Sequence, residues 1–170
     1  MVNPPPPPPP PPPTTTPRLH LVLVEPEIHW NTGNVGRTCL GVGAHLHLVQ
    51  PLGFSLHDKH VRRAGLDYWP RVPLTVWTDW PSLAAALPGL GTPYFFTGRA
   101  VRHYDQVAYA GDTVLIFGRE SVGLPPDLLA ANADALVSIP MRDPQLRSLN
   151  LSTSAAIAAY EVLRQWRARS

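Results

Sequence analysis

The stretch from Thr113 to Pro125 constrains the fold of this chain more than any other. It opens with TVLIF, a run of β-branched and aromatic residues that is typical of a buried strand. Gly118 and Gly123 then supply turn positions on either side of Glu120, and a short helical pattern follows over residues 127–132. A buried strand, a glycine turn and a helix are the layout of a ligand-binding loop at the carboxyl edge of a sheet. A tight loop in which Glu120 only caps a helix fits the same residues, and the spacing matches neither the dinucleotide-binding nor the P-loop pattern.

Strand-like and helical segments alternate along the rest of the chain. Further strands are predicted at residues 19–24, 45–49, 74–77, 93–97 and 135–139, and helices at 31–43, 79–87 and from residue 152 onward. This alternation predicts an α/β fold: a parallel six-stranded sheet with helices on both faces and binding sites at the carboxyl ends of its strands. The last helix is expected to pack through the apolar residues that keep helical period, Ala156, Ala159, Tyr160, Leu163 and Trp166.

The chain divides into a tail and one domain. Pro4 to Pro13 is an unbroken proline run, which favours an extended polyproline segment without backbone donors. Residues 1–17 are therefore predicted to be a disordered, proline-rich tail. The remaining residues, 18–170, are predicted to form one folded domain with a sizeable core.

Charge and cysteine content narrow the function only loosely. The net charge is +2, and Lys59 is the only lysine, so the cations are almost all arginine. The planar guanidinium suits phosphate, which allows a nucleic-acid partner, although genomic base composition produces the same bias. The single cysteine, Cys39, excludes an internal disulfide and favours a reducing, cytoplasmic compartment. No apolar run reaches the roughly 18 residues of a membrane span.

Two further stretches are candidates for binding. Asn31, Asn34 and Arg37 recur every third residue near a helix start that Asn31 or Thr32 would cap, and a helix start favours anions. They form either a phosphate or ribose site, or a solvent-exposed cap with a surface arginine. Residues 57–66 form a basic helical segment that either follows an RNA backbone or is a solvated face.

Three motifs, taken in order, resemble those of a known family. NxGNxxR at 31–37, FGxESxGLP at 117–125 and SLNLS at 148–152 resemble the signature motifs of SPOUT-superfamily RNA 2'-O-methyltransferases. The segments RRAGLDYW at 62–69 and IPM at 139–141 resemble, more narrowly, the small branch that methylates the wobble ribose of tRNA. The resemblance spans residues 19–167, which is the whole predicted domain.

The resemblance implies a cofactor, partners and one unusual fold feature. It implies a deep C-terminal trefoil knot, S-adenosylmethionine as methyl donor without a metal, and a homodimer that binds the anticodon stem-loop of tRNA. The substrate would be cytidine or 5-carboxymethylaminomethyluridine at the wobble position of leucine tRNAs. The cofactor would lie in the knot against residues at strand ends, namely Phe96, Gly118, Ile139, Ser148 and Leu149. The alternatives are methylation of another tRNA position or of ribosomal RNA, and an RNA-binding module without catalysis.

The motifs also imply roles for catalytic residues. Arg37 ends the first motif, and we expect its guanidinium to orient the phosphate beside the reacting ribose. Either that phosphate or a perturbed guanidinium would accept the proton of the 2'-hydroxyl. Asn31 and Glu120 would hold Arg37 and the substrate. Ser148 and Asn150 would shape the site from the side of the knot.

Overall fold

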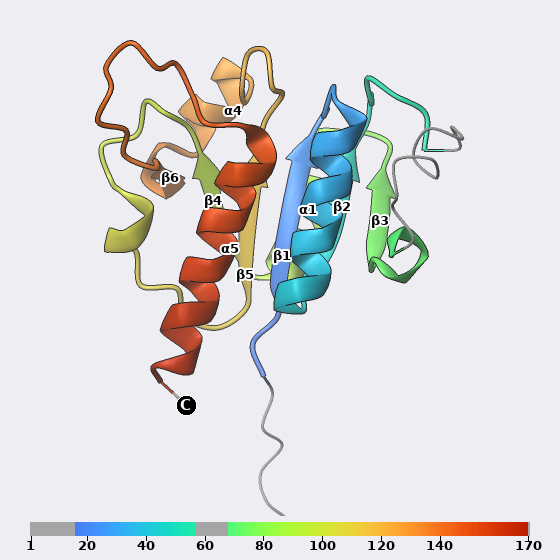
Figure 1. The fold of residues 1–170 in the computed structure, drawn as a ribbon, viewed down its shortest axis with the longest axis horizontal. Coiled ribbons are helices and arrows are strands. Elements are labelled where there is room, and N and C mark those ends of the chain that lie inside the picture. The colour runs from blue at the N-terminus through green and yellow to red at the C-terminus, as the bar shows by residue number, and fades with distance from the viewer. Residues whose placement is uncertain (1–15, 57–67, 170) are drawn as a thin grey trace, which may run out of the picture.

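The computed structural model describes residues 16–56 and 68–169, which form one parallel sheet with helices on both faces (Figure 1). The strands are β1 (Leu19–Val24), β2 (His45–Val49), β3 (Leu74–Trp77), β4 (Thr92–Phe96), β5 (Thr113–Phe117) and β6 (Leu136–Val137). They lie in the order β3-β2-β1-β5-β4-β6, and every neighbouring pair is parallel, as the sequence predicts. β6 is shorter than predicted because Ser138 leaves the ladder and bridges to His103.

Helices cover the two faces of the sheet in pairs. α1 (His29–Val42) and α5 (Leu151–Arg167) pack against each other on one face, in front in Figure 1. α3 (Trp80–Leu90) and α4 (Pro126–Ala131) cover the opposite face. Successive strand residues point to opposite faces, so strands buried on both sides need apolar residues throughout. The core beneath α1 and α5 includes Leu21, Leu23, Leu46, Leu48 and Leu115, and the other core includes Val22, Val24, Val49, Val114 and Ile116.

The start of α1 differs from the prediction. The helix begins at His29, and neither Asn31 nor Thr32 caps it, because both are buried inside its first turn. Ile28 is the N-cap residue and has no side-chain cap. A carboxylate from a distant loop, Glu120, binds the amide of Ile28 instead. Single-sequence reasoning looks for a local cap, and the predicted caps, Asn31 and Thr32, lie three and four residues after the observed N-cap.

The buried face of α5 also differs from the prediction. The buried residues are Leu151, Ala155, Ala158, Ala159 and Val162, so only Ala159 of the predicted set is fully buried. Tyr160 is 54% exposed. The prediction favoured the larger apolar side chains of the helix. Small residues occupy the true interface because alanines let α5 approach the sheet and α1 closely.

Gly36, which weakens α1 locally, is explained by a packing contact. A Cβ atom at this position would lie 2.7 Å from Cζ3 of the Trp69 indole. Trp69 follows directly after Tyr68, which belongs to the same buried cluster. The glycine therefore lets the segment that returns to β3 dock against α1.

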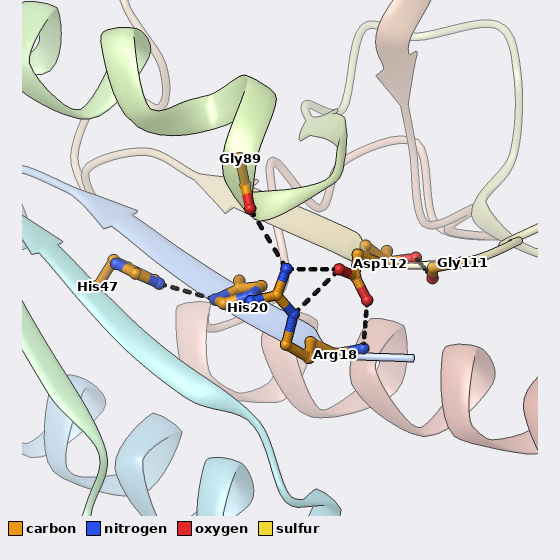
Figure 2. A network of polar contacts seen from close by, with 7 residues as sticks. Arg18, His20, His47, Gly89, Gly111 and Asp112 are labelled. Atoms are coloured by element: carbon orange, nitrogen blue, oxygen red, sulfur yellow. Dashed lines mark hydrogen bonds and ion pairs between the residues drawn. The ribbon is translucent and has the colours of Figure 1, made fainter. Parts of the chain in front are cut away.

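A polar network lies at the amino end of the sheet (Figure 2). The loops that carry the second and third motifs lie at the opposite, carboxyl end (Figure 1). Arg18 forms an ion pair of 2.7 Å with Asp112 and also donates to the carbonyl of Gly89. Beside it, Nδ1 of His20 and Nε2 of His47 lie 2.9 Å apart in the interior. The network ties the first strand to the chain before β5 and to the end of α3.

Two predicted segments lie outside the described residues: the proline run and the basic segment at 57–66. In the part of the chain that the structure describes, no helix is both long and apolar enough to cross a membrane. Cys39 is buried in the core beneath α1. Burial raises the pKa of its thiol to about 12, so Cys39 is unsuited to nucleophilic chemistry.

Candidate active site

Glu120 joins the loop after β5 to the start of α1. Its Oε2 accepts a hydrogen bond of 2.8 Å from the amide of Glu27, and its Oε1 accepts one of 3.3 Å from the amide of Ile28. The side-chain amide of Asn31 donates to the same Oε1 at 3.0 Å. A carboxylate at this end of a helix satisfies amides that have no partner within the helix and favours the helix dipole. Glu120 is therefore a helix cap, but for α1 and not for the helix of its own loop.

Asn31 continues this chain of hydrogen bonds to the third motif. Its Oδ1 accepts a hydrogen bond of 2.9 Å from the side-chain amide of Asn150. Asn150 is the N-cap of α5, and its own Oδ1 accepts from the amides of Ser152 and Thr153. This capping fixes the orientation of the Asn150 amide, because the oxygen must face α5 and the nitrogen must face Asn31. One residue from each motif thus lies in a single connected network.

The loops after β1 and β5 are also held together by contacts from acidic side chains of the first loop to residues of the second. Glu27 accepts hydrogen bonds from both the amide and the hydroxyl of Ser121, at 2.9 and 2.8 Å. Glu25 forms an ion pair with Arg119. β1 and β5 are parallel neighbours, so the loops that leave their carboxyl ends must meet at the same edge of the sheet. These contacts make that edge a defined surface and not a set of independent loops.

Arg37 lies outside this network. It is in the third turn of α1 and is exposed, and its guanidinium carbon is 4.6 Å from the centroid of the Tyr68 ring. The Tyr68 hydroxyl in turn donates to the carbonyl of Gly33 at 2.9 Å. Among the described residues, no contact joins Arg37 to Asn31 or Glu120. The three-residue repeat of Asn31, Asn34 and Arg37 does not place them on one exposed face, because Asn31 is only 2% exposed and the other two are exposed.

The family is decided by comparison with known proteins. The profile of the SpoU rRNA Methylase family matches residues 18–160, which include all three motifs. The chain belongs to the SpoU methylase family. This agrees with the resemblance seen in the motifs, and it covers the sheet, both helix layers and the network around Glu120.

The relatives of this SpoU methylase include tRNA 2'-O-methyltransferases. The tRNA (cytidine(34)-2'-O)-methyltransferase of Burkholderia cenocepacia is 44% identical over 148 residues, which are 86% of this chain and 94% of the relative. A structure solved to study 2'-OH methylation of C/U34 on tRNA is 42% identical with a TM-score of 0.83, covering 90% of this chain and 99% of that chain. The methyltransferase AviRb of Streptomyces viridochromogenes, in complex with AdoMet, has a TM-score of 0.76 at 22% identity. It covers 90% of this chain and 59% of its own, and it shows the shared fold.

The residues expected to hold the cofactor gather near the carboxyl ends of β4, β5 and β6. The Phe96 ring stacks on Phe117 with centroids 4.6 Å apart, and Ile139 lies two residues after the end of β6, beyond Ser138. Leu149 is half-buried and Ser148 is exposed. A Cβ on Gly98 would lie 3.9 Å from the carbonyl of Arg147, so the segment before Ser148 passes beside the turn after β4.

The stacked rings of Phe96 and Phe117 give this region an apolar surface, of the kind that lines sites for flat ring ligands. The turn role predicted for Gly118 is confirmed, whereas its place beside the cofactor stays a prediction. A Cβ on Gly118 would lie 2.2 Å from the backbone of Gly123, so the glycine is required by its own loop. The loop closes through paired hydrogen bonds between Arg119 and Gly123.

Sequence reasoning missed the acidic residues after β1. Glu25 and Glu27 follow a buried strand directly, which is the same signal that identified Glu120. Their role depends on the pairing of β1 with β5, and a single sequence does not show that pairing. Tyr68 belongs to the RRAGLDYW segment, and the sequence does not show that its ring is the contact of the Arg37 guanidinium.

Proposed function

We propose that this SpoU methylase transfers a methyl group from S-adenosylmethionine to the 2'-hydroxyl of nucleotide 34 of tRNA. The observation that carries the proposal is the hydrogen-bonded chain Glu120–Asn31–Asn150, which takes one residue from each of three distant motifs. The substrate class comes from relatives that are 42–44% identical over nearly their whole length. The fold and the family profile support the same chemistry.

The chemistry makes few demands on the protein. S-Adenosylmethionine supplies a methyl group that is already electrophilic, so the protein must align the ribose hydroxyl and provide for loss of its proton. Phe96, Gly118, Ile139, Ser148 and Leu149 would hold the cofactor from the ends of β4, β5 and β6. Neither a metal nor a covalent intermediate on the protein is needed.

Arg37 is the residue we assign to the reacting nucleotide. Its planar fork matches two phosphate oxygens, so it can fix the phosphate next to the ribose. Free arginine is a very weak base, so the phosphate itself or a perturbed guanidinium would take the proton. Arg37→Lys keeps the charge but removes the fork, and turnover should fall while S-adenosylmethionine binding is kept. Near-normal turnover of this variant would exclude the fork.

Asn31, Glu120, Asn150 and Ser148 would act around the reacting ribose. Glu120 is satisfied by three donors, so it is suited to holding the start of α1 rigid. Asn31 lies between Glu120 and Asn150 and would be kept in one rotamer by both. The exposed hydroxyl of Ser148 precedes Asn150 by two residues and can reach a ligand. Rigid placement of this kind raises the reaction rate, because the reacting groups must meet at about 3 Å.

A homodimer would complete the site. Within one chain, Arg37 is exposed on α1 and has no contact with Glu120 among the described residues. A second copy packed against this face would bring its own Arg37 to the network of the first. We also propose that the segment leading into α5 forms the deep trefoil knot, since α5 returns over β5 and β1 after the chain has passed β6.

The natural substrates are proposed to be leucine tRNAs in the cytoplasm, with cytidine or 5-carboxymethylaminomethyluridine at position 34. Ribose-methylation mapping of tRNA from a strain lacking this gene tests the assignment. We expect the 2'-O-methyl group at nucleotide 34 to disappear from leucine isoacceptors and to return with the wild-type gene. An unchanged nucleotide 34, with loss at another tRNA position or in ribosomal RNA, would assign a different substrate.

A further inference from the structure

An exposed tryptophan stands directly beside the network of the active site. Trp30 is 59% exposed, although the next residue, Asn31, is only 2% exposed and bonded to Glu120. The side of α1 that faces the core consists of other residues, among them Val35 and Cys39. Packing in the described chain therefore does not require an indole at this position, and a smaller polar residue would suit the first turn equally well.

The indole belongs to a short aromatic surface. The His29 ring meets it edge-on with centroids 4.7 Å apart, and the same His29 ring lies 6.4 Å from that of Phe54. Phe54 lines a hollow of about 230 Å³ together with Gln50 and Leu52. This surface thus offers a flat apolar ligand an exposed ring face, an aromatic neighbour and an adjoining recess. All three lie at the edge of the sheet where the methyl would be transferred.

A cation shares the exposed side of the helix with Trp30. Residues 30, 34 and 37 are spaced by four and three positions, so they lie on one side of α1, and all three are exposed. Arg37 is roughly 10 Å from Trp30 along the helix axis at 1.5 Å per residue. In the proposed dimer this Arg37 serves the network of the other chain, so Trp30 and the Arg37 of the second copy would contact the base and the phosphate of neighbouring nucleotides at one site.

We propose that Trp30 stacks on an unpaired base next to the nucleotide that is methylated. The inference rests on the proposed function and deepens it, because it names the residue that reads an unstacked loop and not a paired stem. An anticodon loop presents unpaired bases on both sides of nucleotide 34, and aromatic stacking accepts any base. Trp30 is a substrate-binding residue here, and it takes no part in proton transfer.

The test combines a protein substitution with a base deletion. Binding of an anticodon stem-loop RNA is measured for wild type, Trp30→Phe and Trp30→Ala, with intact RNA and with RNAs abasic at one nucleotide beside position 34. Loss of one base stack corresponds to a roughly 5- to 150-fold weaker Kd. We expect that loss for Trp30→Ala on intact RNA, a smaller loss for Trp30→Phe, and no difference between the proteins on one abasic RNA. Val76→Ala, which trims an exposed residue of β3, should bind like wild type.

Three results overturn the proposal. One is a Kd of Trp30→Ala within twofold of wild type on RNA that wild type methylates, which leaves the proposed function intact. Another is an equal loss on every RNA, which assigns Trp30 a structural role. The third is a halved particle mass for Trp30→Ala in light scattering, which assigns the indole to contact with a second copy. If wild type neither binds nor methylates the RNA, the proposed function and the stacking role both fall.

Discussion

The side-chain amide of Asn150 donates a 2.9 Å hydrogen bond to the side-chain oxygen of Asn31, 119 positions earlier in the sequence. Asn31 passes the link to Glu120 at 3.0 Å. Two helix starts and one glycine loop are thereby fixed relative to one another. A site whose residues come from three loops needs such links, because a displacement of about 1 Å can cost a hundredfold in rate.

Substitutions of Asn150 should separate its role as the cap of α5 from its role in positioning Asn31. Serine also caps helices well but lacks an amide that reaches Asn31, so Asn150→Ser should keep α5 stable and lose the link. Asn150→Ala should lose both, with an additional cost of about 1 kcal/mol in the free energy of unfolding. Methyl transfer should fall roughly tenfold or more in both variants, the effect of about 1.4 kcal/mol in the barrier. Urea unfolding and single-turnover kinetics measure the two effects, and full activity of Asn150→Ser would show that the link is dispensable.

Arg37 should act on the partner chain. As homodimers, Arg37→Ala is expected to be nearly inactive and Asn150→Ser to be roughly tenfold or more below wild type. Co-expression with two different affinity tags isolates the mixed dimer. If Arg37 of one chain serves the network of the other, one of the two sites then contains both wild-type residues, and activity should recover to as much as half. Activity no higher than that of the two variants alone would place Arg37 and Asn150 in the same chain's site.

Acid should destabilise the amino end of the sheet. The Trp77 indole N–H can only donate, so Nδ1 of His47 accepts at 3.1 Å and its proton must sit on Nε2, facing His20. Burial lowers the pKa of His47 to about 3 from its ordinary value of 6.5, with further lowering by His45 and His20. Burial, His45 and Arg18 lower the pKa of His20, while Asp112 opposes this.

The direction of the pH effect follows from these shifts. Below pH 6.5 the unfolded chain protonates His47, whereas the folded chain keeps it neutral down to about pH 3. The free energy of unfolding is therefore full above pH 6.5 and falls between there and about pH 3. At pH 5 one such histidine costs roughly 2 kcal/mol. His47→Gln removes the titrating group. The difference between the urea midpoints at pH 8 and pH 5 should therefore be smaller for His47→Gln than for wild type. An equal difference would mean that His47 is not responsible.

Most of the sheet could be predicted from the sequence because its strands are buried on both faces and read as continuous apolar runs. The predictions that were wrong share one physical cause: residues distant in the sequence decide where these helices begin and which side is buried. The cap of α1 comes from Glu120, 92 positions after Ile28, so Asn31 and Thr32 were misread as local caps. The buried side of α5 depends on how closely the helix can approach the sheet, so alanines outweigh Tyr160 and Leu163.

The candidate site, like the fold, could be predicted from the sequence only in part. Motif order identified Asn31, Glu120 and Asn150, and the structure brings these three side chains together. Their partners Glu25 and Glu27 were missed because only the pairing of β1 and β5 gives them a role. The position of Arg37 relative to the network could not be predicted, since helical spacing alone does not show which side of α1 is buried.

The most direct measurement is methyl transfer to a matched pair of RNAs by the purified full-length protein. Both are anticodon stem-loops, and the second lacks only the 2'-hydroxyl of nucleotide 34. With labelled S-adenosylmethionine, we expect label on the first RNA at the ribose of nucleotide 34, none on the second, and a large loss for the Arg37→Ala variant. Equal labelling of the two RNAs, or label on a base, would contradict the account.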